Sequence, residues 1–213
     1  MKLTILGAGG RIGRHALAQA LAREHDVTVL VRDPSRLGDA ANRTRVVLGT
    51  VADAAAVDRA VAGADAVISA LGPDGNRPDQ VEPMRAGMRH TIEAMKRHGV
   101  RRIVNLSGAG ITSSGEPKPL LDRLTTLVVR NVARYVVAAK QAEYDELRKS
   151  DLEWIAVRPA LVTDGPATDR YVAGPGELRP GSRISRADVG HLMVSQAERP
   201  THVGPPGIFV RSR

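Results

Sequence analysis

The 213-residue chain contains no cysteine, and tryptophan, tyrosine and phenylalanine together make up only 2% of it. The absence of cysteine excludes disulfide bonds and thiolate-bound metal ions, so packing has to provide the stability. The scarcity of aromatic residues leaves a core of Val, Leu, Ile and Ala, which favours helices packed on a parallel sheet. No stretch has the apolar length of a membrane span or of a signal peptide, so we expect a cytoplasmic protein.

The net charge of +8 raises the question of nucleic-acid binding. Acidic residues are interspersed among the basic ones and stacking aromatics are nearly absent, so an anionic dinucleotide explains the charge better. We therefore expect a small-molecule substrate, no nucleic-acid or membrane partner, and a monomer or homodimer. The six histidines show no spacing typical of a metal site, so no metal is expected.

Short β-branched runs alternate with alanine-rich segments of helical length, a pattern typical of βα units that feed a parallel sheet. The prediction is an α/β fold of the Rossmann type, a doubly wound parallel sheet with helices on both faces, in one domain spanning residues 1–213. Right-handed crossovers place the carboxyl ends of the strands at one edge, where ligands bind. We predict strands at 3–6, 27–31, 46–48, 66–70, 103–106 and 154–157, and helices near 11–24, 54–61, 83–98 and 121–149.

The pattern loosens after Pro159, and residues 160–213 are predicted to hold a small segment on the substrate side. Residues 163–181 are rich in Gly, Pro and Asp, and they either cover a substrate or simply form a long connection. Ser185 and Asp188 have the spacing of a capping box, which predicts a final helix after them.

A glycine-rich loop follows the first predicted strand directly and opens an amphipathic helix. Glycines here let the chain approach a pyrophosphate that binds the N–H groups at the helix start. The spacing is G-x-x-G-x-x-G, because Ile12 stands where the tighter G-x-G-x-x-G motif needs its third glycine. A purely structural turn is the alternative. The predicted cofactor-binding residues of this loop are Gly7, Gly9, Gly10, Arg11, Ile12 and Gly13.

The second predicted strand ends about twenty residues after the glycines, where cofactor choice is read from the ribose. Arg32 comes first after this strand and can lie against a 2′-phosphate, and Arg36 follows in the same site. Asp33, which precedes a proline, is interpreted as the cap of a short helix. We therefore predict NADP(H). The alternative is that Asp33 takes the ribose hydroxyls, which would favour NAD(H).

Five segments together resemble the atypical short-chain dehydrogenases/reductases of the NAD(P)H-binding, NmrA-like and biliverdin-IXβ-reductase-like type. The resemblance covers nearly the whole chain and is specific for a family, not for a substrate. The segments are residues 7–13, 29–36, 46–50, 63–68 and 151–159.

The resemblance also implies where the rest of the cofactor binds. Thr50 and Val51 would flank the adenine, although relatives usually carry aspartate at the position of Thr50. The segment Ala70, Leu71 and Gly72 would pass the adenosine ribose and the pyrophosphate. The backbone at Pro159, Ala160, Leu161 and Val162 would meet the nicotinamide.

Catalytic positions carry less information. The Tyr-x-x-x-Lys pattern of the wider superfamily is absent, because Tyr135 and Lys140 are one residue too far apart and Tyr144 is followed by Arg148. Lys140 with Glu143 resembles the family's Lys-x-x-Glu, where the lysine reaches the nicotinamide ribose or acts as a base; the alternative is an exposed helical pair.

Ser107 closes the fifth predicted strand, where related proteins place Ser or Thr beside the nicotinamide, or it ties down its own turn. Hydride transfer to a conjugated acceptor requires close stacking and little acid–base machinery. The leading prediction is therefore an NADPH-dependent reductase of a flavin, quinone or carbonyl compound, with Ser107 and Lys140 as the candidate catalytic residues. The alternatives are an NmrA-like sensor of NADP(H) without turnover and, third, an epimerase or dehydratase, for which the segment after Pro159 leaves little room.

Overall fold

A computed structural model describes residues 1–108, 110–112, 133–174, 181–200, 204–205 and 207–212. Its centre is an eight-stranded sheet in the order β3-β2-β1-β4-β5-β6-β10-β8. Every neighbouring pair is parallel except β10 with β8. The strands of this sheet are β1 (Lys2–Leu6), β2 (Asp26–Val31), β3 (Arg45–Leu48), β4 (Ala66–Ser69), β5 (Arg102–Leu106), β6 (Glu153–Pro159), β8 (Tyr171–Gly174) and β10 (Ile208–Ser212).

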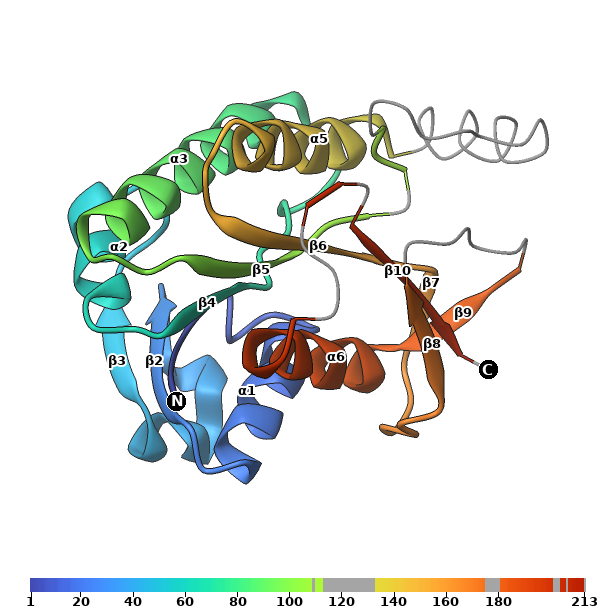
Figure 1. The fold of residues 1–213 in the computed structure, drawn as a ribbon, viewed down its shortest axis with the longest axis horizontal. Coiled ribbons are helices and arrows are strands. Elements are labelled where there is room, and N and C mark those ends of the chain that lie inside the picture. The colour runs from blue at the N-terminus through green and yellow to red at the C-terminus, as the bar shows by residue number, and fades with distance from the viewer. Residues whose placement is uncertain (109, 113–132, 175–180, 201–203, 206, 213) are drawn as a thin grey trace.

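Helices cover both faces of this sheet, which confirms the predicted doubly wound fold (Figure 1). Helices α1 (Gly13–Ala22) and α6 (Arg186–Glu198) pack on one face, and α2 (Ala54–Val61), α3 (Val81–Arg97) and α5 (Arg134–Arg148) pack on the other. Both cores are almost entirely aliphatic, as the composition predicts. None of the helices in the described part of the chain has the length and apolar character needed to cross a bilayer.

Two predicted helix starts are confirmed in detail. The Asp33 carboxylate accepts a hydrogen bond from Ser35 N at 2.9 Å and begins the 3-10 segment η1 (Pro34–Arg43). The Ser185 hydroxyl accepts a hydrogen bond from Asp188 N at 2.9 Å and begins α6. Both side chains replace carbonyl partners that the first N–H groups of a helix lack.

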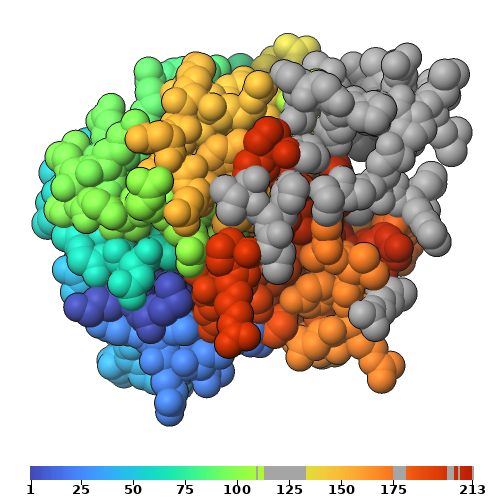
Figure 2. Space-filling model, viewed as in Figure 1, coloured from blue at the N-terminus to red at the C-terminus, as the bar shows by residue number. Residues whose placement is uncertain are grey.

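The carboxyl-terminal part of the sheet was not predicted. Residues 163–181 contain β8, and β10 lies between β6 and β8. A second small parallel sheet pairs β7 (Leu161–Thr163) with β9 (Arg183–Ser185). In Figure 2 the red-orange atoms of α6 lie between the blue atoms of the first elements and the orange atoms of the chain that follows β6. Of the predicted helix at 121–149 the structure describes α5, and the earlier part of that prediction lies outside the described residues.

Candidate functional site

The glycine loop turns sharply between β1 and α1. Gly7 has a φ of +81°, and Gly10 N donates a hydrogen bond to Gly7 O at 2.9 Å. A Cβ on Gly13 would lie 2.0 Å from Gly7 O, and a Cβ on Gly7 would lie 3.0 Å from Ala70 O. The loop therefore packs backbone against backbone, and these positions have no room for a side chain.

Helix α1 begins at Gly13, two residues later than predicted, after Ile12 as its N-cap. No side chain among the described residues caps it, and no acidic residue stands in its first turn. The amino end of a helix carries unpaired N–H groups and a positive partial charge. The loop and the helix start therefore form a cradle that suits a pyrophosphate, with no carboxylate in that turn to repel it.

Arg32 and Asp33 leave the end of β2 with different partners. The Asp33 carboxylate holds the start of η1, and the hydrogen bond from Ser35 holds the pKa of this fully exposed group below its usual value. Arg32 Nη2 lies 3.1 Å from Asp74 Oδ2, in the connection after β4. Arg36 is exposed, and a Cβ on Gly9 would lie 3.2 Å from its Cβ. Two arginines thus stand beside the glycine loop, while the acid between them is engaged as a cap.

Thr50 and Val51 follow β3 at the same edge. Thr50 is exposed, and its hydroxyl accepts a hydrogen bond from Ala52 N at 3.3 Å. Val51 O accepts a hydrogen bond from His90 Nδ1 at 2.9 Å. A Cβ on Gly87 would lie 2.6 Å from Val51 Cγ2, so α3 packs directly on this segment. His90 and Gly87 were not predicted as supports, because the sequence does not reveal that α3 reaches the connection after β3.

Lys140 joins the ends of two strands from its place on α5. Its ammonium donates hydrogen bonds to Leu71 O at 2.5 Å, to Leu106 O at 2.8 Å and to Glu143 Oε2 at 2.9 Å. Three donors are all that an ammonium has, so every proton of Lys140 is used within the protein. Both residues of the pair are buried, which excludes the alternative of an exposed helical pair.

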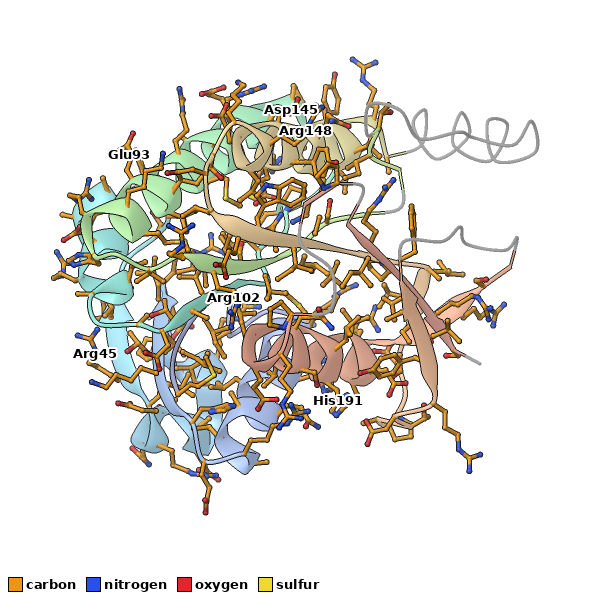
Figure 3. All side chains as sticks on the ribbon, in the orientation of Figure 1. Arg45, Glu93, Arg102, Asp145, Arg148 and His191 are labelled. Carbon is orange, nitrogen blue, oxygen red and sulfur yellow. The ribbon has the colours of Figure 1, made fainter. Side chains whose placement is uncertain are left out.

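Glu143 lies at the centre of a buried polar group. Burial raises its pKa above the ordinary value, against the opposing attraction of the Lys140 ammonium. Ser69 and Asn105, which face each other in the register of β4 and β5, are also fully buried. The Asn105 amide also acts on the Glu143 carboxylate and, like the ammonium, opposes the rise of its pKa. Within the described residues, Ser69 Oγ has no hydrogen-bond partner. Figure 3 shows the contrast with Asp145 and Arg148, which lie on the outer side of the same helix.

Ser107 lies just after β5 and is 6% exposed. Its backbone N–H donates to Val157 O at 2.8 Å, whereas its hydroxyl has no partner among the described residues. The side chain therefore makes no hydrogen bond to the described part of its own turn. The Ser107 hydroxyl can act as hydrogen-bond donor and as acceptor, and it lies at the carboxyl edge next to Leu106, which binds the Lys140 ammonium.

The chain beyond β6 is fixed by its own backbone. Ala160 N donates to Val210 O at 2.9 Å, and Leu161 N donates to Ser182 O at 3.2 Å. Val162 pairs with Ile184 between β7 and β9, and the Leu161 side chain is 64% exposed. This segment presents apolar surface next to the end of β6, while its first N–H groups are used within the protein.

Two of the tyrosines have different surroundings. Tyr144 is fully buried, and its ring meets Trp154 edge to face with centroids 5.4 Å apart. Tyr135 lies at the start of α5, where its N–H donates to Asn76 Oδ1 at 2.8 Å. The sequence lacks the Tyr-x-x-x-Lys pattern, and Tyr144, which stands four residues before Arg148, belongs to the core.

Asp188 ties the connection between β7 and β8 to helix α6. Its buried carboxylate accepts hydrogen bonds from Thr168 N at 2.7 Å, Asp169 N at 3.0 Å, Thr168 Oγ1 at 3.0 Å and Ser185 Oγ at 2.9 Å. Burial alone would raise the pKa of Asp188, but these bonds lower it overall. Nearby, Tyr171 OH lies 2.8 Å from Nδ1 of His191, which Figure 3 labels on α6. The spacing of Ser185 and Asp188 revealed the cap, but nothing in the sequence identified Thr168 as the second partner.

One cavity of about 230 Å³ opens at the opposite edge, where the strands begin. It is lined by polar side chains and backbone of β1, β2 and β3, among them Lys2, Thr28 and Arg45. The Arg45 guanidinium is occupied by Thr28 Oγ1 at 3.1 Å and by Arg59 O at 2.9 Å. The motifs described above therefore gather at the carboxyl edge, away from this cavity.

A family model described as NAD(P)H-binding matches residues 7–200 of the chain. The chain belongs to the NAD(P)H-binding family. This confirms the resemblance to atypical short-chain dehydrogenases/reductases, and it supports a nicotinamide cofactor for the protein.

Relatives of this NAD(P)H-binding protein include reductases. The chain is 34% identical over 205 residues to the 3-diazoavenalumate denitrifying reductase of a Streptomyces species, covering 90% of this chain and 64% of that protein. It is 28% identical over 230 residues to cinnamoyl-CoA reductase 1 of Oryza sativa, covering 92% of this chain and 67% of that protein. The chain thus spans about two thirds of the length of these two proteins.

The fold of the NAD(P)H-binding protein also recurs in solved structures. A short-chain dehydrogenase/reductase from Veillonella parvula superposes with a TM-score of 0.80 at 22% identity, covering 99% of this chain and 94% of that one. At that identity the likeness shows the fold alone. The reductases among the relatives support a general assignment as an oxidoreductase.

Proposed function

We propose that this protein is an NADPH-dependent reductase that transfers hydride to a small conjugated acceptor such as a flavin, quinone or carbonyl compound. The proposal rests on the different contacts made by the two residues that follow β2. Asp33 is engaged as a helix cap, and Arg32 extends beside the glycine loop. An arginine at this place suits a 2′-phosphate, whereas NAD(H) needs a free carboxylate for the ribose hydroxyls.

The proposed cofactor would lie against the glycine loop, where a Cβ on Gly13 or Gly7 would collide with backbone. The glycine loop and the start of α1 would hold the pyrophosphate, and Arg32 and Arg36 would hold the 2′-phosphate. Thr50 and Val51 would border the adenine, and Ala70 to Gly72 would pass the ribose. When bound, the cofactor supplies the hydride, which carries the electron pair that the reduction needs.

The nicotinamide half is proposed to lie between the end of β5 and the segment after β6. Ser107 would donate a hydrogen bond to the acceptor or to the nicotinamide, because its buried hydroxyl has no partner among the described residues. Leu161 and Val162 would exclude water from the reacting groups. Lys140 is proposed as a positioning residue that fixes the ends of β4 and β5, while its contact with the nicotinamide ribose stays a prediction that requires one of its three hydrogen bonds to exchange.

The choice of acceptor follows from the shortage of acids. Tyr144 lies in the core and the Lys140 protons are all engaged, so an acceptor that takes its proton from water suits the site best. Flavins and quinones meet this requirement because hydride addition to them depends on stacking more than on proton transfer.

The same shortage favours a second candidate function, an NADP(H) sensor without turnover. Such a protein would bind the cofactor and pass its redox state to a protein partner. Loss of the absorbance of reduced nicotinamide with a panel of flavins, quinones and carbonyls would support the reductase. Tight binding of NADPH with no turnover on any acceptor would support the sensor.

The cofactor proposal is tested first by calorimetric titration of NADPH and NADH into cofactor-free protein. In Arg32→Ala we expect the affinity for NADPH to fall about 10- to 100-fold, because charge-assisted bonds to the phosphate are lost. The affinity for NADH should change little. Arg77→Ala removes an equally exposed arginine paired with Asp79 and serves as the control. Equal affinities for both cofactors in the wild type would contradict the proposal.

A further inference from the structure

The ion pair between Arg32 and Asp74 spans the glycine loop. Arg32 follows β2 and Asp74 lies in the connection after β4, and these two strands flank β1 on either side. Arg32 Nη2 and Asp74 Oδ2 are 3.1 Å apart, with side chains 61% and 65% exposed. Two charged groups thus meet across the strand whose glycine loop is proposed to hold the pyrophosphate.

The connection that carries Asp74 is held by hydrogen bonds at several points. Asp74 N donates to Gln80 Oε1 at 3.1 Å, just before α3. Asn76 Oδ1 accepts from Tyr135 N at 2.8 Å and so joins the same connection to the start of α5. The Asp74 carboxylate is therefore presented toward β2 by a supported backbone.

We propose that Asp74 is a specificity-determining residue that competes with the 2′-phosphate of the cofactor for Arg32. This inference rests on the proposed function, in which Arg32 binds that phosphate. A phosphate and a carboxylate satisfy a guanidinium through the same fork of N–H donors. Binding of NADP(H) exchanges one anion for the other, and the released carboxylate then stays close to the phosphate and repels it.

A cofactor without the 2′-phosphate brings no new partner for Arg32. Its affinity therefore depends little on whether Asp74 carries a charge. Asp74 restrains the binding of NADP(H) more than that of NAD(H), which keeps the preference between them below what Arg32 alone would give.

The expected size of this effect is modest because both groups are exposed. Exposed ion pairs contribute at most about fivefold to an equilibrium constant, and repulsion between the freed carboxylate and the phosphate adds to this. We expect Asp74→Asn to tighten binding of a 2′-phosphorylated ligand by about three- to tenfold at low salt, and by less at high salt because both terms are screened.

The experiment titrates the full chain with adenosine 2′,5′-bisphosphate and with adenosine 5′-monophosphate, neither of which requires turnover. The variants are Asp74→Asn, Arg32→Ala and the double variant. Asp79→Asn is the matched control, because Asp79 lies in the same connection, pairs with Arg77 at 3.3 Å and is 63% exposed. We expect Asp74→Asn to tighten the bisphosphate and to change the monophosphate less than about twofold. In the Arg32→Ala background the gain should disappear.

Several results would overturn the inference. Unchanged or weaker bisphosphate binding in Asp74→Asn would show that no competition exists. An equal gain in the Arg32→Ala background or in Asp79→Asn would show a general effect of charge. Weaker monophosphate binding would show that Asp74 accepts the ribose hydroxyls. Failure of the NADP(H) proposal has a different signature, because Arg32→Ala alone would then leave bisphosphate binding unchanged.

Discussion

The carboxyl edge of the sheet has two parts that are built differently. The β1–β3 part comprises the glycine loop and the residues after β2 and β3, and its charged side chains are exposed. The β4–β6 part comprises the ends of β4, β5 and β6, and its polar side chains are buried under α5. The first part fixes its shape with backbone contacts between glycines, and the second fixes it with one lysine and one glutamate.

This difference separates binding from stability. An exposed ion pair contributes little to folding, so the β1–β3 part can change its charges at little cost. A buried ion pair has lost its hydration, so removal of one partner leaves the other in a poor environment. Cofactor selectivity should therefore respond to substitutions that leave the fold intact, whereas the nicotinamide side should tolerate few changes.

Lys140→Met should have the largest effect on stability. It leaves the Glu143 carboxyl buried without its cation and frees the carbonyls of Leu71 and Leu106. We expect the free energy of unfolding to fall by about 3–5 kcal/mol, measured by urea denaturation. Lys149→Met is the control, because Lys149 is the C-cap residue of the same helix, and its side chain is 69% exposed where it pairs with Glu146. This variant should cost less than about 0.5 kcal/mol.

The cost of Lys140→Met should also depend on pH. The pKa of Glu143 is already raised in the folded protein, so its contribution to stability is present below the unfolded value of 4.5 and is lost as pH rises through the folded value. Removal of the ammonium raises that folded value further. The deficit should therefore be larger at about pH 8 than at about pH 5. If the loss of stability in Lys140→Met does not change with pH, or equals the loss in Lys149→Met, the buried pair of Lys140 and Glu143 does not have the proposed role.

Gly13→Ala tests whether the β1–β3 part also has a rigid element. The new Cβ would meet Gly7 O at 2.0 Å, so the loop has to move, at a cost of about 1–3 kcal/mol. NADPH affinity should fall at least tenfold, since the N–H groups at the helix start move with the loop. Gly174→Ala in β8 is the control, because nothing lies within 4 Å of a Cβ there and the position is outside the proposed cofactor site. An unchanged affinity of Gly13→Ala for NADPH would show that the pyrophosphate does not bind at this loop.

Asp188→Asn examines the connection that borders the nicotinamide side. The carboxylate accepts four hydrogen bonds, and we expect its neutral replacement to cost about 2 kcal/mol. The pKa of Asp188 is lowered, so its contribution is present above the unfolded value of 3.8 and is lost as pH falls below it. Thermal melting as a function of pH should therefore show a weaker loss of stability in acid for the variant. Parallel curves for the two proteins would mean that the charge of Asp188 has no part in holding the connection.

Ser107→Ala should have the smallest effect on folding. Its hydroxyl has no partner among the described residues, so its removal should change the free energy of unfolding by less than about 1 kcal/mol. If Ser107 touches the nicotinamide or the acceptor, kcat should fall while the affinity for NADPH is retained. Ser69→Ala removes another buried hydroxyl without a described partner and should leave kcat unchanged. Equal kcat for wild type and Ser107→Ala would exclude a catalytic role.

The sequence predicted those elements whose signals are local. The first six strands, the cap at Asp33 and the start of α6 at Ser185 follow from β-branched runs and from the chemistry of helix starts. The glycine loop is also local, because three glycines at fixed spacing serve one turn. Such patterns identify an element without knowledge of its neighbours.

The rest depends on contacts between distant segments. Strands β7 and β9 have three residues each, and β8 is largely exposed, so these runs show no strong periodicity. Strand β10 has five residues, and its place depends on β6 and β8. The partner of Lys140 at Leu71, the partner of Arg32 at Asp74 and the partner of Asp188 at Thr168 are all far apart in sequence. Spacing along the chain predicts Lys140 with Glu143, but it cannot reveal that both are buried.

Because β10 lies between β6 and β8, the sheet can be completed only after β10 has been synthesised. Strand β8 is made first but bonds only to β10 in the sheet, and β6 keeps an open edge until β10 arrives. While the ribosome is still making residues 175–207, an unpaired parallel edge remains beside a nearly complete Rossmann core. The open edge of β6 is therefore covered only once the last strand of the sheet has been made.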